Sequence, residues 1–317
     1  MIEYSFIVPV YNDGYLVEPF CVEFEKVFKD YLDLEDIREK VELIFINDGS
    51  ENDSFKTLKE QSVKFAFIKA IDLSRNFGQH IAISCGYEHA KGKYIGMMNV
   101  DMQDPPSEIP KLLNCIKNND CDIVFGRRKE DVRSYSERIS SHAFNFLLNK
   151  LSGFGAPLNT ATLRVMNRRF IDGYNRLEEK TRYLPGLELW LGFKHIHVDI
   201  KQQKRKSGKS SYTFKKRLMM AADAILSFSD LPLRVTAYMG IVVAFLGFLL
   251  GLILVVQKIF FIELQPGYTS TISLIVFIGG VQILVVGLSG LYVGRILNET
   301  RGRPLYLIRE MIGASDD

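Results

Sequence analysis

The sequence is poor in cysteine, and its charges are nearly balanced. Four cysteines occur among 317 residues, and their positions do not have the spacing that is typical of metal sites. We therefore interpret them as reduced thiols of a cytosolic protein and as small core residues. The formal net charge is only +3, so the composition does not indicate a nucleic-acid or polyanion partner.

The N-terminus also lacks the features of a secretory signal. Glu3 stands where a basic region would be expected, and the first apolar run ends at Pro9. Positive charge is concentrated instead between Lys201 and Arg217. A basic segment beside apolar helices suits anionic lipid headgroups or an anionic lipid substrate.

Two long stretches, 237–256 and 272–291, contain no charged residue. Each is close to the roughly 20 residues that a helix needs to span a bilayer, and we expect the second helix to continue to residue 297. Arginines flank the pair, whereas the loop 257–271 carries little positive charge. The positive-inside rule therefore predicts a two-helix transmembrane hairpin with both chain ends in the cytoplasm.

Upstream of the basic segment, short apolar runs alternate with helical patterns. The runs that we interpret as strands are 4–10, 41–46, 66–73, 93–98 and 122–125. This alternation predicts an α/β fold with a doubly wound, mostly parallel sheet and right-handed crossovers. Polar residues follow each run, and the carboxyl ends of parallel strands are where such sheets bind ligands.

The most informative of these polar stretches is 99–106, which follows the fourth predicted strand. If the chain stays extended there, Asn99, Asp101 and Gln103 share one face. Oxygen ligands of this kind suit Mg²⁺ or Mn²⁺, usually with substrate phosphates completing the shell. A solvated turn with incidental acids is the alternative, and we interpret Asp104 as a turn or helix-start residue.

Four motifs in order carry a resemblance to a known family. They lie at 8–12, 47–50, 73–79 and 100–106. With this spacing the chain resembles the family 2 glycosyltransferases. It looks most like the branch that moves a sugar to a polyprenyl phosphate, which includes dolichyl-phosphate mannose synthases and bactoprenyl glucosyltransferases. The resemblance covers essentially the whole chain, and it implies a sheet of the nucleotide-sugar transferase type.

The resemblance also implies a set of site residues. The nucleotide-binding residues are Pro9, Tyr11, Asp13, Asp48, Arg75, Asp101 and Gln103. A divalent metal, Mg²⁺ or Mn²⁺, would be held by Asp101 and Gln103, with Asn99 as a further ligand. The residues expected at the acceptor phosphate are Arg128, Arg138, Arg205, Lys209 and Ser210. The residues expected to carry catalysis are Asp101, Arg164 and Arg205.

The chain departs from the family pattern at several of these positions. Asn99 stands where the metal motif usually begins with Asp, so one negative charge is lost and metal affinity is expected to fall. Thr162 stands where many relatives have Asp before the element that contains Arg164. Asp13 replaces the usual Glu, and Ser211 replaces a lysine that nearby Lys209 can substitute for.

These features predict four parts of the chain. They are a cytoplasmic catalytic domain at 1–212, an amphipathic juxtamembrane helix at 213–233, transmembrane helices within 234–297 and a cytoplasmic tail at 298–317. The resemblance implies an inverting enzyme of the bacterial inner membrane. Its donor would be a nucleotide sugar and its acceptor undecaprenyl phosphate on the cytoplasmic leaflet, for cell-envelope glycans. A homo-oligomer and a separate flippase are expected with it.

Two other functions stay open at this point, as do the sugar and the nucleotide. One is a glycosyltransferase whose acceptor is a lipid hydroxyl. Such an acceptor needs a general base, and Glu188 is the candidate. We interpret Glu188 as structural, because a phosphate acceptor removes the need for a base. The other is a non-catalytic membrane scaffold that retains nucleotide binding, which the neutral residues Asn99 and Thr162 would favour.

Overall fold

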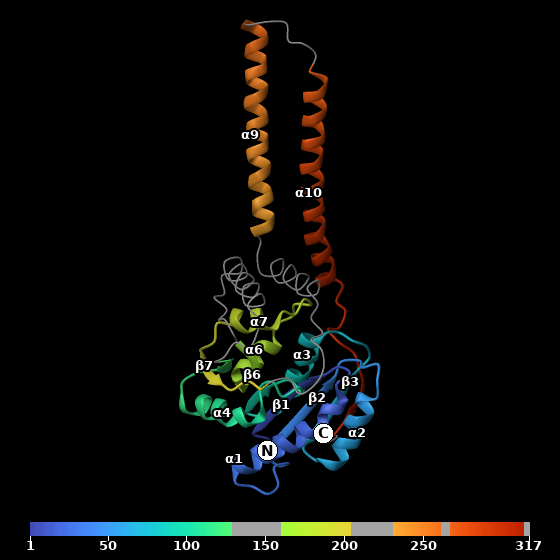
Figure 1. Ribbon diagram of the computed structural model, residues 1–317, viewed down its shortest axis with the longest axis vertical. Coiled ribbons are helices and arrows are strands. Elements are labelled where there is room, and N and C mark those ends of the chain that lie inside the picture. The colour runs from blue at the N-terminus through green and yellow to red at the C-terminus, as the bar shows by residue number, and fades with distance from the viewer. Residues whose placement is uncertain (129–159, 204–230, 261–266, 314–317) are drawn as a thin grey trace. The chain divides into compact units, whose positions relative to one another are not determined.

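The computed structural model describes residues 1–128, 160–203, 231–260 and 267–313 (Figure 1). This part of the chain divides into two compact units. Residues 1–203 and 303–313 belong to the first unit, and residues 231–302 belong to the second. The chain therefore leaves the first unit before the second unit begins and returns to it afterwards.

The first unit is built on one sheet of eight strands. The strands are β1 Tyr4–Val10, β2 Val41–Asn47, β3 Ile68–Leu73, β4 Tyr94–Met97, β5 Ile123–Arg128, β6 Thr160–Asn167, β7 His195–Ile200 and β8 Ile308–Ile312. Their order is β7-β5-β6-β4-β1-β2-β3-β8. The pairings make β6 and β8 antiparallel to their neighbours, while the other strands share one direction. The prediction of a mostly parallel α/β sheet is thus confirmed.

Strands β6 and β8 were not predicted, whereas β7 lies in the segment 193–200, whose alternating pattern predicts a half-exposed strand. Strand β6 lies between β4 and β5 and pairs antiparallel with both, so β5 does not pair directly with β4. Strand β8 pairs antiparallel with β3 at the edge of the sheet. Its residues lie in the segment that the sequence predicted to be a tail, so the end of this segment is part of the first unit.

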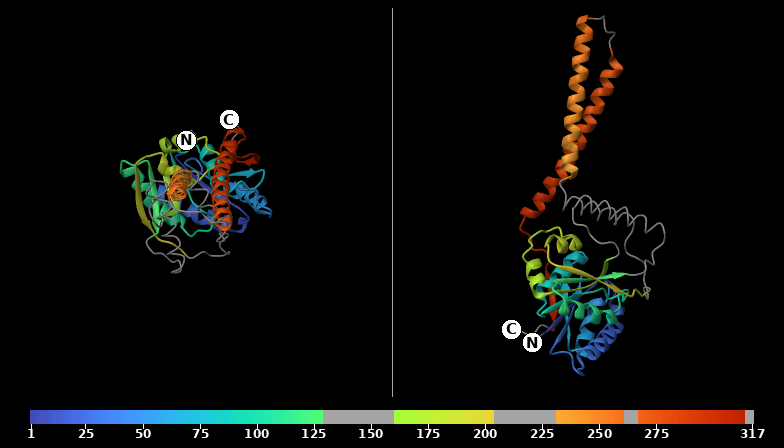
Figure 2. Two further views of the ribbon diagram at one scale, coloured as in Figure 1. Left: turned by 90° about the horizontal axis from the view of Figure 1, so that it is seen from above. Right: turned by 90° about the vertical axis from the view of Figure 1, so that its left-hand side faces the viewer.

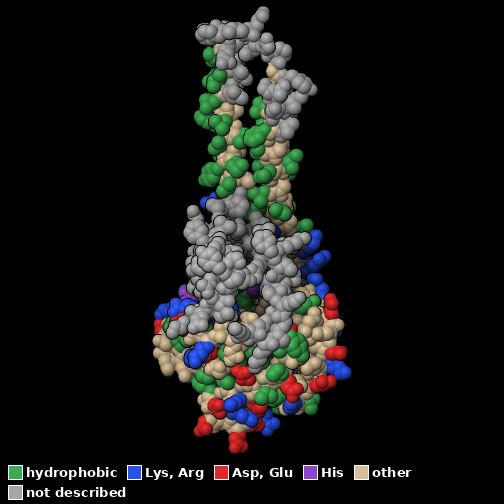
Figure 3. All heavy atoms as spheres, viewed as in Figure 1, with side chains coloured by type: hydrophobic (Ala, Val, Ile, Leu, Met, Phe, Trp, Pro, Cys, Tyr) green, Lys and Arg blue, Asp and Glu red, His purple; other side chains and the backbone are tan. Residues whose placement is uncertain are grey.

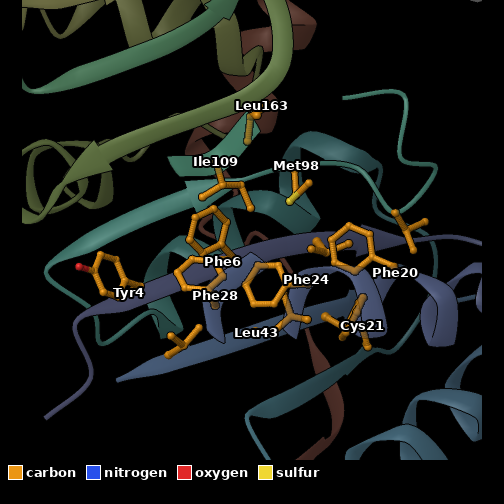
Figure 4. Close-up of a cluster of buried hydrophobic side chains, with 14 of the residues drawn as sticks. Tyr4, Phe6, Phe20, Cys21, Phe24, Phe28, Leu43, Met98, Ile109 and Leu163 are labelled. Carbon is orange, nitrogen blue, oxygen red and sulfur yellow. The ribbon is translucent and has the colours of Figure 1, made fainter. Parts of the chain in front are cut away.

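Helices cover both faces of the sheet (Figure 1). They are α1 Val17–Leu32, α2 Ser54–Lys64, α3 Gln79–His89, α4 Ile109–Asn118, α6 Arg168–Asn175 and α7 Leu184–Trp190, with short 3-10 turns at Gly14–Leu16 (η1) and Pro106–Glu108 (η2). Alternate residues of β1 point to opposite faces. Phe6 packs against Phe24 and Phe28 of α1, with ring centroids 5.4 Å apart in both pairs (Figure 4). Ile7 faces Gly86 of α3, where a Cβ would come within 2.4 Å of Ile7.

The second unit consists of two helices, α9 Leu231–Phe260 and α10 Tyr268–Thr300, which lie side by side (Figure 2). Most side chains described on them are hydrophobic and exposed (Figure 3). In the described part of the chain, one segment, Phe277–Thr300, is long and apolar enough to cross a membrane, with mean hydropathy 1.8. The apolar run Leu233–Leu249 is shorter. Both predicted helices exist, and the two membrane crossings stay a prediction.

Candidate active site

The order of the strands indicates where this sheet binds a ligand. From β1 the sheet continues through β2 and β3 on one side and through β4 on the other. Open α/β sheets bind ligands at such a switch point, outside the carboxyl ends of the strands. Tyr11 follows β1 there and is 43% exposed, and the turn that contains Asp101 follows β4. The predicted nucleotide and metal residues therefore come from strands that meet at this rim.

The loops after β1 and β2 are joined through Asn12. The Asn12 N–H donates to Ser50 Oγ at 2.9 Å, and Asn12 Oδ1 accepts from the N–H of Glu51 at 3.0 Å. Asn12 also has a positive φ of 61°, a conformation that Asn tolerates better than most residues. Because Tyr11 and Asp13 flank Asn12, the second loop fixes the segment in which they lie. Asn12 was not among the predicted site residues.

Asp48, in the loop after β2, attaches the loop after β3 to the loops after β1 and β2. Its carboxylate accepts from the N–H groups of Phe77 at 2.7 Å and Gly78 at 2.9 Å, and burial raises its pKa. Gly49 next to it has φ 62°, and a Cβ there would lie 2.2 Å from the backbone of Arg75. Asp48 therefore orders the loop that carries Arg75, and the predicted contact of Asp48 with a nucleoside stays a prediction.

The stretch after β4 is a turn and not an extended segment. Met102 has a φ of 55°, so the expectation of an extended chain was wrong. The predicted alternation of the side chains is nevertheless seen in how deeply they are buried. Val100 and Met102 are 4% and 1% exposed, whereas Asn99, Asp101 and Gln103 are only partly buried. The oxygen-bearing side chains are left on the outer side because the two apolar ones enter the core.

Both the oxygen and the nitrogen of the Asn99 side-chain amide form hydrogen bonds. Its Oδ1 accepts from Gln79 Nε2 at 3.0 Å, and its Nδ2 donates to Thr162 Oγ1 at 3.3 Å. These bonds join α3, the turn after β4 and β6. Asn99 and Thr162 are the two neutral residues that stand where the family pattern has an acid. In this chain their side chains form a hydrogen bond with each other. The predicted role of Asn99 as a metal ligand would add a third partner to this amide.

Asp104 lies in the bend directly before η2, which agrees with its interpretation as a turn residue, and its carboxylate joins this bend to β5 and β6. No side chain caps η2, which begins after Pro105. The Asp104 carboxylate instead accepts from Arg128 Nε at 3.0 Å and Arg128 Nη2 at 3.1 Å. It also accepts from the N–H of Thr162 at 2.9 Å. Arg128 keeps 26% of its side chain exposed, and its predicted contact with an acceptor phosphate stays a prediction.

Arg164 lies in the interior next to this turn, in register with Met97 of β4. Its side chain is 7% exposed and forms an ion pair with Glu188 of α7, whose side chain is fully buried. Arg164 Nε also donates to the carbonyl oxygen of Thr162 at 3.0 Å. The pair agrees with the structural interpretation of Glu188. It also places the Arg164 guanidinium among protein partners and not on the exposed rim.

His80 lies near this pair, and its titration gives a test of how strongly this part of the site is buried. Burial, with a contribution from Arg164, lowers the pKa of His80 from 6.5 to about 4. Between pH 6.5 and pH 4, His80 is protonated in the unfolded chain and neutral in the folded one. The contribution of neutral His80 to stability is therefore complete above pH 6.5 and is lost as the pH falls towards 4. We expect His80→Gln to flatten the fall in melting temperature between pH 6.5 and 4.5. His195→Gln, at an exposed histidine, is the control, and equal slopes in both variants would contradict the assignment.

The residues at the rim are compatible with a divalent cation. Within the described ranges, no three His, Cys, Asp or Glu side chains lie close enough to form a metal site by themselves. Asp101 and Gln103 supply one carboxylate and one amide oxygen. Mg²⁺ and Mn²⁺ are commonly bound by one or two such ligands, with water and substrate phosphates completing the coordination.

Several predicted residues lie outside the described part of the chain. They are Arg138, Arg205, Lys209 and Ser210. Most of the predicted juxtamembrane helix, 213–230, lies outside it as well. The roles of these residues at the acceptor phosphate stay predictions.

Two family models match the chain. The model of glycosyl transferase family 2 matches residues 5–174, and the model of the GtrB C-terminal hairpin matches residues 231–296. The first match contains the rim described above, and the second contains α9 and most of α10.

Relatives match the chain over nearly its whole length. The uncharacterized glycosyltransferase YkcC of Bacillus subtilis is 33% identical over 98% of this chain and 95% of its own. Undecaprenyl-phosphate 4-deoxy-4-formamido-L-arabinose transferase of Proteus mirabilis is 31% identical, over 98% and 94%. Bactoprenol glucosyl transferase of Shigella phage SfX is 32% identical, over 96% and 98%.

Proposed function

Because the chain belongs to glycosyl transferase family 2 and carries the GtrB-type C-terminal hairpin, we propose that it transfers a sugar from a nucleotide-sugar donor to a polyprenyl phosphate. The observation that carries the proposal is the combination of these two parts in one chain, with Asp101 and Gln103 at the switch point of the sheet. Relatives that match the chain over 94% and 98% of their own length are named undecaprenyl-phosphate 4-deoxy-4-formamido-L-arabinose transferase and bactoprenol glucosyl transferase.

The donor is proposed to bind at the rim between β1 and β4. Tyr11 and Asp13, held by the joined loops, would contact the nucleoside, and Asp101 and Gln103 would lie at the diphosphate. A divalent cation bound by these two side chains would neutralise charge on the leaving nucleoside diphosphate. The fixed loops supply orientation, which lowers the entropic part of the barrier.

The acceptor chemistry explains why no general base is needed. The second pKa of a phosphate monoester is about 6, so its oxygen is already ionised near pH 7. This oxygen forms a bond to the anomeric carbon while the bond from that carbon to the diphosphate oxygen breaks. The leaving nucleoside diphosphate takes the electron pair, and a single displacement inverts the configuration.

Cations are needed to hold two phosphate groups close together. The residues proposed to contact the acceptor phosphate are Arg128, Arg138, Arg205, Lys209 and Ser210. Guanidinium groups suit this role because they bind phosphate oxygens in pairs. Arg164 is proposed to act through its charge, because its guanidinium is held by Glu188 and the residue is in register with Met97, the last residue of β4 before the turn that contains Asp101.

The helical hairpin is proposed to place this reaction at the cytoplasmic face of the bacterial inner membrane. The exposed apolar side chains of α9 and α10 need a nonpolar environment. The first unit contributes strands before and after the hairpin in sequence, which supports the proposal that both ends of the hairpin lie on one side of the membrane. A homo-oligomer is part of the proposal, and so is a separate flippase, because the product forms inside and such sugars are used outside.

The proposal predicts transfer to a lipid phosphate and not to a lipid alcohol. Purified protein in detergent would be incubated with Mg²⁺ or Mn²⁺ and a panel of nucleotide sugars, with either undecaprenyl phosphate or undecaprenol as acceptor. We expect turnover of one donor with the phosphate, and a rate lower by ~100-fold or more with the alcohol, because the alcohol would need a general base. Equal transfer to undecaprenol would favour the hydroxyl acceptor, and nucleotide binding without transfer to either lipid would favour a scaffold.

A further inference from the structure

We propose that Arg309 of β8 is a positioning residue for the donor nucleotide site. The inference rests on the proposed function, because it takes the loops after β1 and β2 as the place where the nucleotide binds. It adds a connection from the segment that follows the helical hairpin to those loops.

Arg309 reaches from the edge strand into the end of β3. Its Nη1 donates to Asp72 Oδ2 at 3.1 Å, and its Nη2 donates to the carbonyl oxygen of Ser74 at 2.6 Å. The Asp72 side chain is 2% exposed, whereas the Arg309 side chain is 58% exposed. The arginine therefore brings its charge from the surface to a buried carboxylate. Ser74 begins the loop that contains Arg75.

From Asp72 the contacts continue towards the nucleotide loops. Asn47 Nδ2 donates to Asp72 Oδ1 at 2.6 Å, and Ser50 Oγ donates to Asn47 Oδ1 at 2.5 Å. Ser50 Oγ then accepts from the N–H of Asn12 at 2.9 Å. Four hydrogen bonds thus join Arg309 to the residue between Tyr11 and Asp13.

The direction of each hydrogen bond makes the network depend on Arg309, the charged residue at one end of it. Asp72 accepts from both neighbours, so Arg309 supplies the only positive charge that the described contacts give to this buried carboxylate. Without it, the carboxylate keeps one neutral donor, and a buried charge in that state is unfavourable. Rearrangement of Asp72 would release Asn47, whose amide orients the Ser50 hydroxyl. The loops after β1 and β2 would then be correctly arranged for a smaller fraction of the time.

This loss of order has a calculable effect on binding. When only a fraction of molecules has the binding-competent arrangement, the apparent dissociation constant rises by the inverse of that fraction. If the competent fraction falls to about one tenth, nucleotide affinity falls about tenfold. The acceptor site and the intrinsic rate of transfer are not affected by this mechanism. The donor KM should therefore rise while kcat at saturating donor changes little.

The same strand supplies a matched control. Glu310 pairs with Lys59 of α2 at 2.7 Å, and both side chains are almost half exposed. This pair also ties β8 to the first unit, but no described contact continues from it to the nucleotide loops. Glu310→Gln therefore removes one ion pair of β8 and leaves the network intact.

The test uses the full-length chain in detergent, with Arg309→Ala, Arg309→Lys and Glu310→Gln compared with wild type. Hydrogen–deuterium exchange is measured on peptides that cover 11–14 and 48–52 without any nucleotide. Binding of UDP and GDP with Mg²⁺ is measured by calorimetry, together with donor KM and kcat. For Arg309→Ala we expect faster exchange in both peptides and an approximately tenfold weaker nucleotide affinity. Arg309→Lys, which keeps the charge, should recover most of both, and Glu310→Gln should match wild type.

The outcomes separate this inference from the proposed function. Unchanged exchange and unchanged nucleotide affinity in folded Arg309→Ala would overturn the positioning role. Equal losses in Arg309→Ala and Glu310→Gln would overturn it too, because they would show a general loosening of β8. Faster exchange in Arg309→Ala, with neither nucleotide bound by wild type, would support the network and overturn its assignment to a donor site.

Discussion

Replacing Asp101 by asparagine is expected to lower sugar transfer by about 10²–10³-fold. At the switch point, Asp101 supplies a partly exposed carboxylate in the turn after β4, between Asn99 and Gln103 in sequence, whereas the carboxylate of Asp104 is buried and paired with Arg128. Groups that stabilise developing charge in the transition state typically contribute this much to kcat. The loss should be larger than in an enzyme that has an acid in place of Asn99, since Asn99 is neutral. Single-turnover transfer with saturating donor measures it.

The fold should tolerate this substitution. Asp101 is partly exposed, and its Oδ1 accepts from the Gln103 N–H at 3.2 Å, a bond that an asparagine oxygen can also accept. The melting temperature of Asp101→Asn is therefore expected to stay near the wild-type value. Glu51→Gln is the matched control, because it removes an exposed acid from a neighbouring loop and should leave transfer unchanged. A less than threefold loss in Asp101→Asn would exclude a charge-stabilising role.

Local sequence patterns were sufficient to predict much of the sheet and the residues that lie at the carboxyl ends of its parallel strands. Runs such as 41–46 are buried on both faces in a parallel sheet, so they appear in the sequence as continuous apolar segments. Their polar ends lie at one rim because parallel strands share a direction. The alternation at Val100, Asp101 and Met102 likewise indicated which side chains remain outside, although the backbone there turns.

The parts that sequence analysis missed depend on contacts between distant residues. Strand β6 enters the sheet between β4 and β5, and nothing in the 160–167 segment itself indicates which neighbours it has. Strand β8 is similar, since it pairs with β3 from the far end of the chain. Asp104 was interpreted as a turn or helix-start residue, because acids are favoured where helices begin, but its partner Arg128 comes from another strand and this pairing was not predicted. Charged pairs of this kind have no signature in local sequence.

Disrupting the buried pair between Glu188 and Arg164 should affect stability more than any other change considered for the first unit. Removing one partner of a buried ion pair typically costs about 3–5 kcal/mol, because the other charge stays buried without compensation. Glu188→Gln keeps the shape of the side chain and removes its charge, so Arg164 would keep only neutral partners such as the carbonyl oxygen of Thr162. Thermal or denaturant unfolding in detergent, followed by circular dichroism, measures the loss.

A double substitution tests whether the loss comes from the unpaired charge. Replacing a whole buried pair by apolar residues of similar size is often neutral or stabilising. We therefore expect Arg164→Met combined with Glu188→Leu to be more stable than Glu188→Gln alone. If the double variant is the less stable one, the side chains contribute mainly through contacts that the apolar residues cannot replace.

The same Glu188→Gln variant separates the two kinds of acceptor. A general base for a lipid hydroxyl must reach the acceptor, whereas the Glu188 side chain is fully buried and paired with Arg164. We expect the folded fraction of Glu188→Gln to bind nucleotide and to retain transfer to undecaprenyl phosphate within about tenfold per folded molecule. A variant with wild-type stability and nucleotide affinity, but with transfer reduced ~10³-fold or more, would instead identify Glu188 as a base. Since a phosphate monoester needs no base at neutral pH, that result would favour a hydroxyl acceptor for this enzyme.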